Sequence, residues 1–280
     1  MFQTRVWSCI RGLLLSLTLL FLTGCSEEEN PAGESTPTDP AAGLIAYGEV
    51  AGDGFTAKLF AADSLKVGMN HVMVQLVDTS GEPLLPDSIA YLPMMHMMEM
   101  DHSCPHGSFV PMESRYSFYA AETMFIMPSG MMGTWDLELT VTAAPGGAAD
   151  TVVFEDVLVL DSPWMQRFTY EPGEGDPVYY FTALEGLEDP IVGLNPVQLS
   201  IARRETLTDF PFVEDLTVTV ETYMPSMGHG STGNVDPSGS GGGHYEGVVA
   251  FNMTGDWEVT FTVTDTSGTE LGQVVYALVF

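Results

Sequence analysis

Residues 133–142 read GTWDLELTVT and residues 255–264 read GDWEVTFTVT, so one ten-residue pattern occurs twice, 122 residues apart. Beginning with Trp135 and Trp257, apolar side chains at every second position alternate with threonine and acidic residues. A period of two is typical of a strand with one buried and one solvent-facing side, because successive side chains point to opposite faces. We therefore expect both segments to be strands that face a hydrophobic core, with their tryptophans buried.

The two copies of this pattern belong to a longer internal repeat. Four further landmarks recur in the same order at offsets of 122 to 127 residues. The first two are VGMN at 67–70 with VGLN at 192–195, and MxxMxH at 97–102 and again at 224–229. The other two are FIM at 125–127 with FNM at 251–253, and VVF at 152–154 with VVY at 274–276. A constant order at nearly constant spacing indicates a tandem duplication. With only two copies, we interpret the units as separate domains rather than as a solenoid.

Within each copy, short alternating runs are separated by turn sequences such as DTSG at 78–81 and 265–268. No helical period of useful length is found. Short strands at this spacing, in units of about 110–120 residues, predict an all-β chain of two tandem immunoglobulin-like β-sandwich domains. We expect the domains to cover residues 44–162 and 163–280.

The N-terminus carries the pattern of an export signal. Residues 1–24 contain two arginines and then a mostly apolar run at 13–22, which is too short to span a bilayer comfortably. The sequence LTGC at 22–25 follows and resembles the bacterial lipobox. This resemblance implies cleavage before Cys25 and attachment of lipid to its sulfur. An ordinary signal peptide followed by a chance cysteine is the alternative.

Residues 25–43 then read as the lipidated cysteine and a flexible tether, because Pro, Gly, Ser and Glu dominate the segment. Ser26 resembles the outer-membrane sorting class. We therefore expect an outer-membrane lipoprotein that faces the periplasm or the cell surface, with its lipid as the only membrane attachment.

The charge balance excludes one class of partner. Eight Lys and Arg residues face 38 Asp and Glu residues, which gives a net charge of −30. Nucleic acid is excluded as a natural partner, because its phosphates require clustered cations. We interpret the acidic residues as a solvated coat.

One stretch concentrates metal-binding side chains. Residues 93–106 read PMMHMMEMDHSCPH, with five Met, three His and one Cys in fourteen positions. A core-filling role is the alternative for methionine, but here methionine is interleaved with His, Glu and Asp. Soft sulfur donors select Cu(I), whereas zinc favours Cys and His without thioethers, and calcium and magnesium favour oxygen. The candidate ligands in this stretch are His96, Met97, Met100, His102 and Cys104.

The second copy repeats this chemistry more sparsely. Residues 224–229 read MPSMGH, and His244 follows a stretch rich in Gly and Ser. Its candidate ligands are Met224, Met227, His229, His244 and Met253. Met127 is a further candidate in the first copy, and for Met127 and Met253 packing beneath the ligand loop is an equally good interpretation.

Cys104 is the one thiol expected in the mature chain after cleavage and lipidation. It cannot form an internal disulfide. Intermolecular pairing, a buried inert thiol and a metal ligand remain as alternatives.

The sequence MPSMGH with GDW downstream resembles the YtkA-like family, to which FixH-like proteins are related. The first copy resembles the branch of that family that carries MMHM, HSCP and FIMPS segments. The resemblance implies an immunoglobulin-like fold, an extracytoplasmic location, and a role in copper handling or oxidase maturation. It supports Met97, Met100 and His102 in one copy, and Met224, Met227 and His229 in the other.

These observations predict an exported copper-binding lipoprotein for Cu(I) storage, tolerance or delivery, with a copper-trafficking or oxidase-assembly protein as its partner. The alternative is a non-catalytic immunoglobulin-like module whose methionine-rich surface binds another protein. No Ser/His/Asp or Cys/His arrangement has supporting sequence context, so we do not expect an enzyme.

Overall fold

The computed structural model describes residues 41–112, 115 and 117–280 of the chain. The predicted signal peptide, Cys25 and most of the predicted tether lie outside the described residues. The described part is built from seventeen β-strands, and it contains no helix long and apolar enough to cross a membrane. Residues Asp39–Phe280 form one compact unit.

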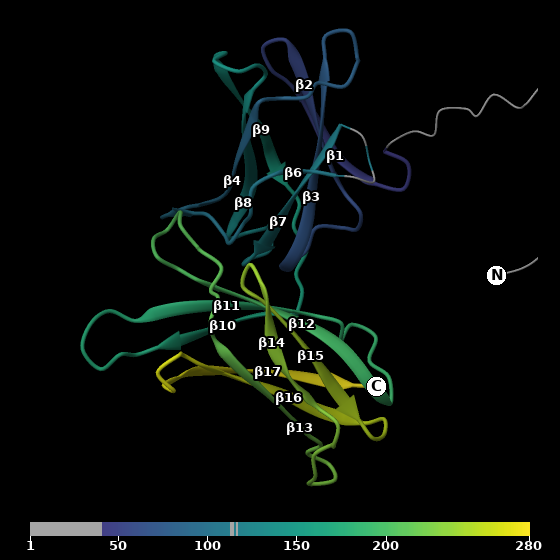
Figure 1. Ribbon diagram of the computed structural model, residues 1–280, viewed down its shortest axis with the longest axis vertical. Coiled ribbons are helices and arrows are strands. Elements are labelled where there is room, and N and C mark those ends of the chain that lie inside the picture. Colours follow the sequence, from purple (N-terminus) through teal and green to yellow (C-terminus); the bar gives the residue numbers. More distant parts are fainter. Residues whose placement is uncertain (1–40, 113–114, 116) are drawn as a thin grey trace, which may run out of the picture. The chain divides into compact units, whose positions relative to one another are not determined.

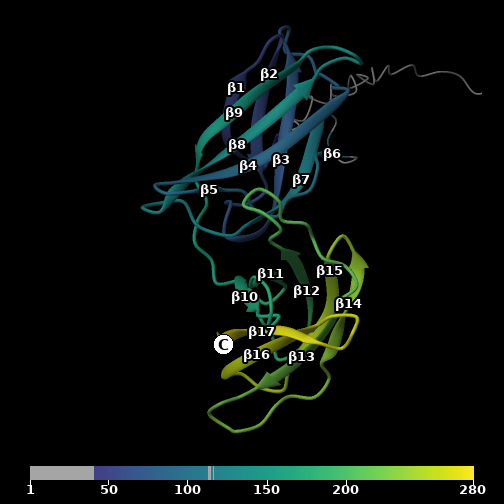
Figure 2. The ribbon, with the colours of Figure 1, turned by 90° about the vertical axis from the view of Figure 1, so that its left-hand side faces the viewer.

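The first nine strands form two antiparallel sheets that we call the N-terminal sandwich (Figures 1 and 2). The strands are β1 (Ile45–Ala51), β2 (Phe55–Ala61), β3 (Gly68–Asp78), β4 (Ser88–Met97), β5 (Asp101–His102), β6 (Val110–Pro111), β7 (Phe118–Phe125), β8 (Gly133–Thr142) and β9 (Ala149–Val157). One sheet has the order β1-β2-β3-β7-β6 and the other β5-β4-β8-β9.

The remaining strands form the C-terminal sandwich, which is coloured green to yellow in Figure 1. They are β10 (Met165–Tyr170), β11 (Val178–Glu185), β12 (Gly193–Arg203), β13 (Thr217–Tyr223), β14 (Val235–Gly241), β15 (His244–Phe251), β16 (Asp256–Thr264) and β17 (Glu270–Val279). Its sheets have the orders β10-β11-β12-β15-β14 and β13-β16-β17.

Both sandwiches have the strand order of an immunoglobulin-like fold. In the constant-type immunoglobulin order, strands A, B, E and D form one sheet and strands C, F and G the other. The sheets β2-β3-β7-β6 and β4-β8-β9 reproduce this order, as do β11-β12-β15-β14 and β13-β16-β17. Each sandwich adds one strand before A, and the first also adds β5 beside C. The predicted all-β, immunoglobulin-like fold class is therefore confirmed.

Each sandwich encloses its own hydrophobic core. Trp135 lies in the first core and Trp257 in the second, both almost completely buried. Along β8 and β16 the predicted alternation holds, because apolar side chains are buried while the Thr and acidic side chains between them are partly or fully exposed. Burial of these side chains supplies the main driving force for folding.

The VGMN and VGLN landmarks are equivalent in structure as well as in sequence. The Asn70 side chain accepts a hydrogen bond from the Lys66 N–H (3.0 Å) and donates to the carbonyl oxygens of Lys66 (2.7 Å) and Gly68 (2.8 Å). Asn195 makes the same three bonds four and two residues upstream, at 2.8, 3.0 and 3.3 Å. The asparagine therefore closes the same turn before strand B in both copies, as expected for a duplicated unit.

Candidate metal centre

A short hairpin brings the first set of predicted ligands together. The strand β4 ends at Met97, the chain turns, and β5 returns antiparallel so that Met95 lies opposite His102. The Met97 N–H donates to the Met100 carbonyl oxygen across this turn (3.2 Å). The spacing MxxMxH is therefore the length of one tight hairpin, which places Met97, Met100 and His102 at one end of the sandwich.

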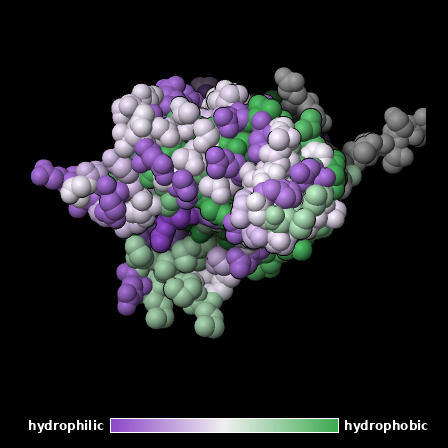
Figure 3. All heavy atoms as spheres, turned by 90° about the horizontal axis from the view of Figure 1, so that it is seen from below, coloured by the Kyte–Doolittle hydropathy of each residue, from purple (hydrophilic) through white to green (hydrophobic). Residues whose placement is uncertain are grey.

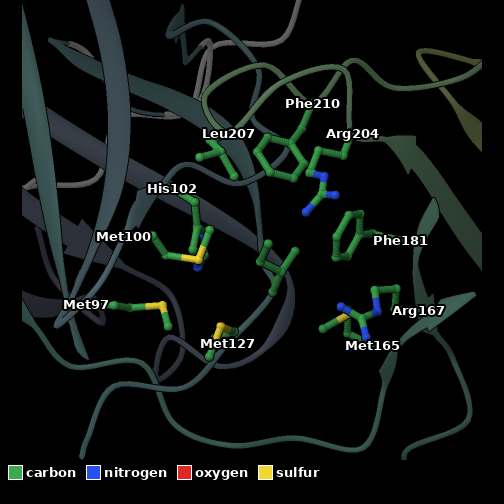
Figure 4. Close-up of a pocket in the computed structure, with 11 residues that line it drawn as sticks. Met97, Met100, His102, Met127, Met165, Arg167, Phe181, Arg204, Leu207 and Phe210 are labelled. Atoms are coloured by element: carbon green, nitrogen blue, oxygen red, sulfur yellow. The ribbon is translucent and has the colours of Figure 1, made fainter. Parts of the chain in front are cut away.

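A pocket of about 320 Å³ lies at this end, and Met97, Met100, His102 and Met127 all line it. Met127 comes from the connection between β7 and β8, next to the hairpin. In Figure 4 the sulfur atoms of the three methionines and the imidazole of His102 lie on the same side of the pocket. Three thioethers and one imidazole of the N-terminal sandwich thus share one space, and Met165 adds a fourth thioether from the C-terminal sandwich.

Hydrogen bonding fixes which nitrogen of His102 can bind a metal. His102 is buried, its Nδ1 lies 2.7 Å from the Ser103 carbonyl oxygen, and its ring stands edge-on to Trp135 at 5.7 Å. A carbonyl oxygen can only accept a hydrogen bond, so Nδ1 carries the proton and donates it. The lone pair of the neutral ring is then on Nε2, which is the usual arrangement of a metal-binding histidine.

The second copy repeats this local geometry. His229 Nδ1 lies 3.0 Å from the Gly230 carbonyl oxygen, and the ring stands edge-on to Trp257 at 6.1 Å. Trp257 Nε1 donates to the Met253 carbonyl oxygen (3.1 Å), as Trp135 Nε1 donates to that of Met127 (2.9 Å). The predicted equivalence of the two ligand loops thus extends to the orientation of the imidazole.

The thioethers of the second copy are less well gathered. Met224 packs in the core, whereas Met227 is exposed to 61% and Met253 to 38%. The second set is therefore divided between the interior and the surface, while the first set lines one pocket.

The structure does not place Cys104 in the pocket. Its side chain is completely buried in the N-terminal core, and burial raises the pKa of the thiol well above its ordinary value. Only the thiolate binds metal well, so this thiol is inert at neutral pH. The strand β5 ends at His102, and Ser103 and Cys104 after it are buried. Of the alternatives for Cys104, the buried thiol agrees with the structure.

Two predicted histidine ligands also lie elsewhere. His96 directs both ring nitrogens at carboxylates, Nδ1 at Asp101 (3.3 Å) and Nε2 at Asp136 (3.4 Å). His244 begins β15, whereas Met253 follows the far end of that strand, about 20 Å away at the usual rise per residue. His244 instead contacts Ser200 Oγ (2.7 Å) and pairs with Glu122 (3.0 Å).

Among the described residues, no three or more His, Cys, Asp or Glu side chains form a group that could hold a metal ion. A metal site in the described part of the chain thus depends on thioether donors. Cu(I) favours these soft ligands, whereas zinc and calcium favour other ligand types.

Further methionines surround the hairpin on the outside. Met98 and Met131 are fully exposed and Met132 is largely exposed. They come from the β4–β5 turn and the β7–β8 connection, which lie side by side because Met97 pairs with Gly133. Seen from below, the surface of the molecule mixes hydrophilic groups, in purple, with hydrophobic groups, in green (Figure 3).

Half of the pocket lining could not be found from the sequence. Met165, Arg167, Phe181, Arg204 and Phe210 line the pocket from the C-terminal sandwich. They lie far along the chain from residues 97–127 and belong to none of the repeated landmarks. No local pattern marks side chains that become neighbours only when the two sandwiches pack.

Residues 193–262 match the model of the YtkA-like family. This stretch covers most of the second copy, including Met224, Met227, His229 and Met253. The resemblance of the first copy to the same family, and the FixH-like relationship, stay predictions.

No curated protein matches the chain. Among solved structures, the Yersinia pseudotuberculosis adhesin InvE is similar over 80% of this chain and 58% of the adhesin chain, with 14% identity and a TM-score of 0.25. A tandem pair of titin Ig domains is similar over 77% of this chain and 89% of that chain, with 14% identity and a TM-score of 0.18. This chain thus spans less than two thirds of the adhesin, and the immunoglobulin-like assignment rests on the strand order described above.

Proposed function

We propose that the protein is an exported, lipid-anchored Cu(I)-binding protein that stores, sequesters or delivers copper. The observation that carries this proposal is that Met97, Met100, Met127 and His102 line one pocket, and that Nδ1 of His102 is hydrogen-bonded to a carbonyl oxygen, which leaves Nε2 as the nitrogen able to bind a metal. The sequence LTGC at 22–25 supports export and lipid attachment, and the YtkA-like stretch supports a binding module rather than an enzyme.

The donor set matches the chemistry of the monovalent ion. Thioethers are soft ligands without a proton to lose, so they bind Cu(I) and keep binding it in acidic surroundings. The Nε2 atom of His102 adds one nitrogen donor, because Nδ1 is hydrogen-bonded to the Ser103 carbonyl oxygen. Cu(II) favours nitrogen and oxygen ligands, and is expected to bind this pocket more weakly than Cu(I).

The first test is a Cu(I) titration of the chain without its first 40 residues, in the presence of a reductant and a coloured Cu(I) chelator. We expect a dissociation constant below micromolar, and the same value for Cys104→Ala, because that thiol is buried outside the pocket. Binding no tighter than micromolar would contradict the proposal. If Cys104→Ala binds Cu(I) tenfold more weakly than the wild type, the thiol contributes to binding, and the assignment of the site to the thioether pocket is wrong.

The second candidate function is a partner-binding module. It is favoured by the exposure of Met98, Met131 and Met132, since methionine surfaces adapt to different partners. This function predicts that a complex with the partner survives when copper is chelated. Under the copper-delivery proposal, chelation should weaken the complex.

A further inference from the structure

The half of the pocket that is lined by Met97, Met100, His102 and Met127 faces a second half that carries positive charge. Arg167 and Arg204 line the pocket there, as Figure 4 shows. The chain has eight Lys and Arg residues against 38 acidic residues, so two guanidinium groups in one pocket form an unusual concentration of positive charge. Global electrostatics do not explain it, because the protein as a whole repels anions.

Within the part of the chain that the structure describes, neither arginine forms an ion pair with an acidic side chain. The neighbouring Arg203 pairs with Glu205, whereas no carboxylate of the described residues lies within ion-pair distance of Arg167 or Arg204. Their guanidinium carbons lie over the ring of Tyr179 instead, at 5.6 and 4.0 Å from its centroid. Stacking on an aromatic ring holds a guanidinium group in place and leaves its N–H donors available.

The surroundings of the two arginines are apolar. Phe181 and Phe210 are buried and meet edge-to-face at 5.6 Å between ring centroids, and Met165 and Ile126 complete this wall. The Ser103 N–H donates to the Leu207 carbonyl oxygen (2.7 Å), which ties the loop between Arg204 and Phe210 to the residue next to His102. The pocket is therefore formed before a ligand enters.

We propose that this half of the pocket binds a small organic carboxylate with an apolar body. The planar fork of arginine matches a carboxylate, which can accept two parallel N–H bonds. The phenylalanine and methionine wall gives an apolar body a surface that a bare inorganic anion would not use. The whole pocket, with its thioether-lined half, measures about 320 Å³, at the small end of the range for ligand pockets, so the arginine-lined half suits a short apolar body such as that of octanoate.

The test uses octanoate as the probe, measured by titration calorimetry on the metal-free chain at fixed ionic strength. We expect saturable binding of one octanoate per chain, and at least tenfold weaker binding of 1-octanol, which has the same tail without the charge. The Arg167→Gln/Arg204→Gln variant should bind octanoate at least tenfold more weakly than the wild type.

Arg203→Gln is the matched control, because it removes one positive charge from the adjacent residue, which is paired with Glu205 and does not line the pocket. It should bind octanoate as the wild type does. Arg204→Lys is the second variant if the double variant does not fold, and it should lose affinity because the fork is lost although the charge stays.

Equal binding of octanoate and 1-octanol would overturn the proposal, since the pocket would then be merely apolar. Unchanged affinity in folded arginine variants, or no binding of octanoate at millimolar concentration, would also overturn it. The proposal does not rest on copper, because octanoate binding is measured on the metal-free chain, so failure of metal binding and failure of carboxylate binding can be told apart.

Discussion

Exchange of Met97, Met100 and Met127 for leucine is expected to weaken Cu(I) binding at least a hundredfold while the protein stays folded. Leucine has nearly the same volume as methionine, and such exchanges usually cost less than about 1.5 kcal/mol of stability each. It has no lone pair for a metal. Of the pocket's sulfur and imidazole side chains, only His102 and Met165, which lines the pocket from the C-terminal sandwich, would remain. A hundredfold loss corresponds to about 2.7 kcal/mol of binding free energy.

The measurement is chelator competition, with thermal unfolding of the same samples to confirm the fold. The matched control exchanges the exposed Met98, Met131 and Met132 for leucine, which removes the same number of thioethers from the same end of the sandwich. We expect this control to keep its Cu(I) affinity. If the control loses as much affinity as the pocket variant, the ion is held by the outer methionines and the pocket assignment is wrong.

Replacement of Gly133 by alanine is expected to lower the free energy of unfolding by about 3 kcal/mol or more. Gly133 has φ 159° and pairs with Met97. A Cβ atom there would lie 2.3 Å from the His96 carbonyl oxygen. That oxygen belongs to the backbone of β4 and cannot move without disturbing the strand that carries Met97. Chemical denaturation of the purified variant measures the loss.

Gly255→Ala is the comparison that the duplication provides. Gly255 has φ 147°, but a Cβ there would meet the terminal methyl group of Met224, at 2.1 Å. A flexible methionine end can rotate away, so we expect a smaller loss of stability than for Gly133→Ala. A Gly133→Ala protein as stable as the wild type would show that β4 and β8 do not approach as closely as described.

Much of the fold follows from residue patterns alone. The alternation from Trp135 to Val141, and its counterpart after Trp257, predicts strands and their buried faces, because burial in a sheet depends on side-chain parity. The repeated landmarks predict two equivalent units, and the structure gives both the same strand order. Positions of the domain boundaries stay a prediction.

The candidate site could be predicted only for those of its residues that lie close together in the sequence. Met97, Met100 and His102 come together because six residues form one hairpin, and a hairpin can be recognised from sequence. No sequence pattern decides between the alternatives for Cys104, because its burial results from how the chain packs after β5 ends at His102. The position of His244 could not be predicted from the sequence, because the Gly-rich segment belongs to β14 and its turn, which place His244 and Met253 at opposite ends of β15.

X-ray absorption at the copper edge, on the Cu(I)-loaded chain without its first 40 residues, tests the central claim most directly, because the scattering shell reports which elements surround the ion. The account predicts a shell dominated by two or three sulfur atoms with one imidazole nitrogen, and loss of the sulfur shell in the Met97→Leu/Met100→Leu/Met127→Leu variant. A shell of nitrogen and oxygen alone, or a sulfur shell that this variant retains, would contradict it.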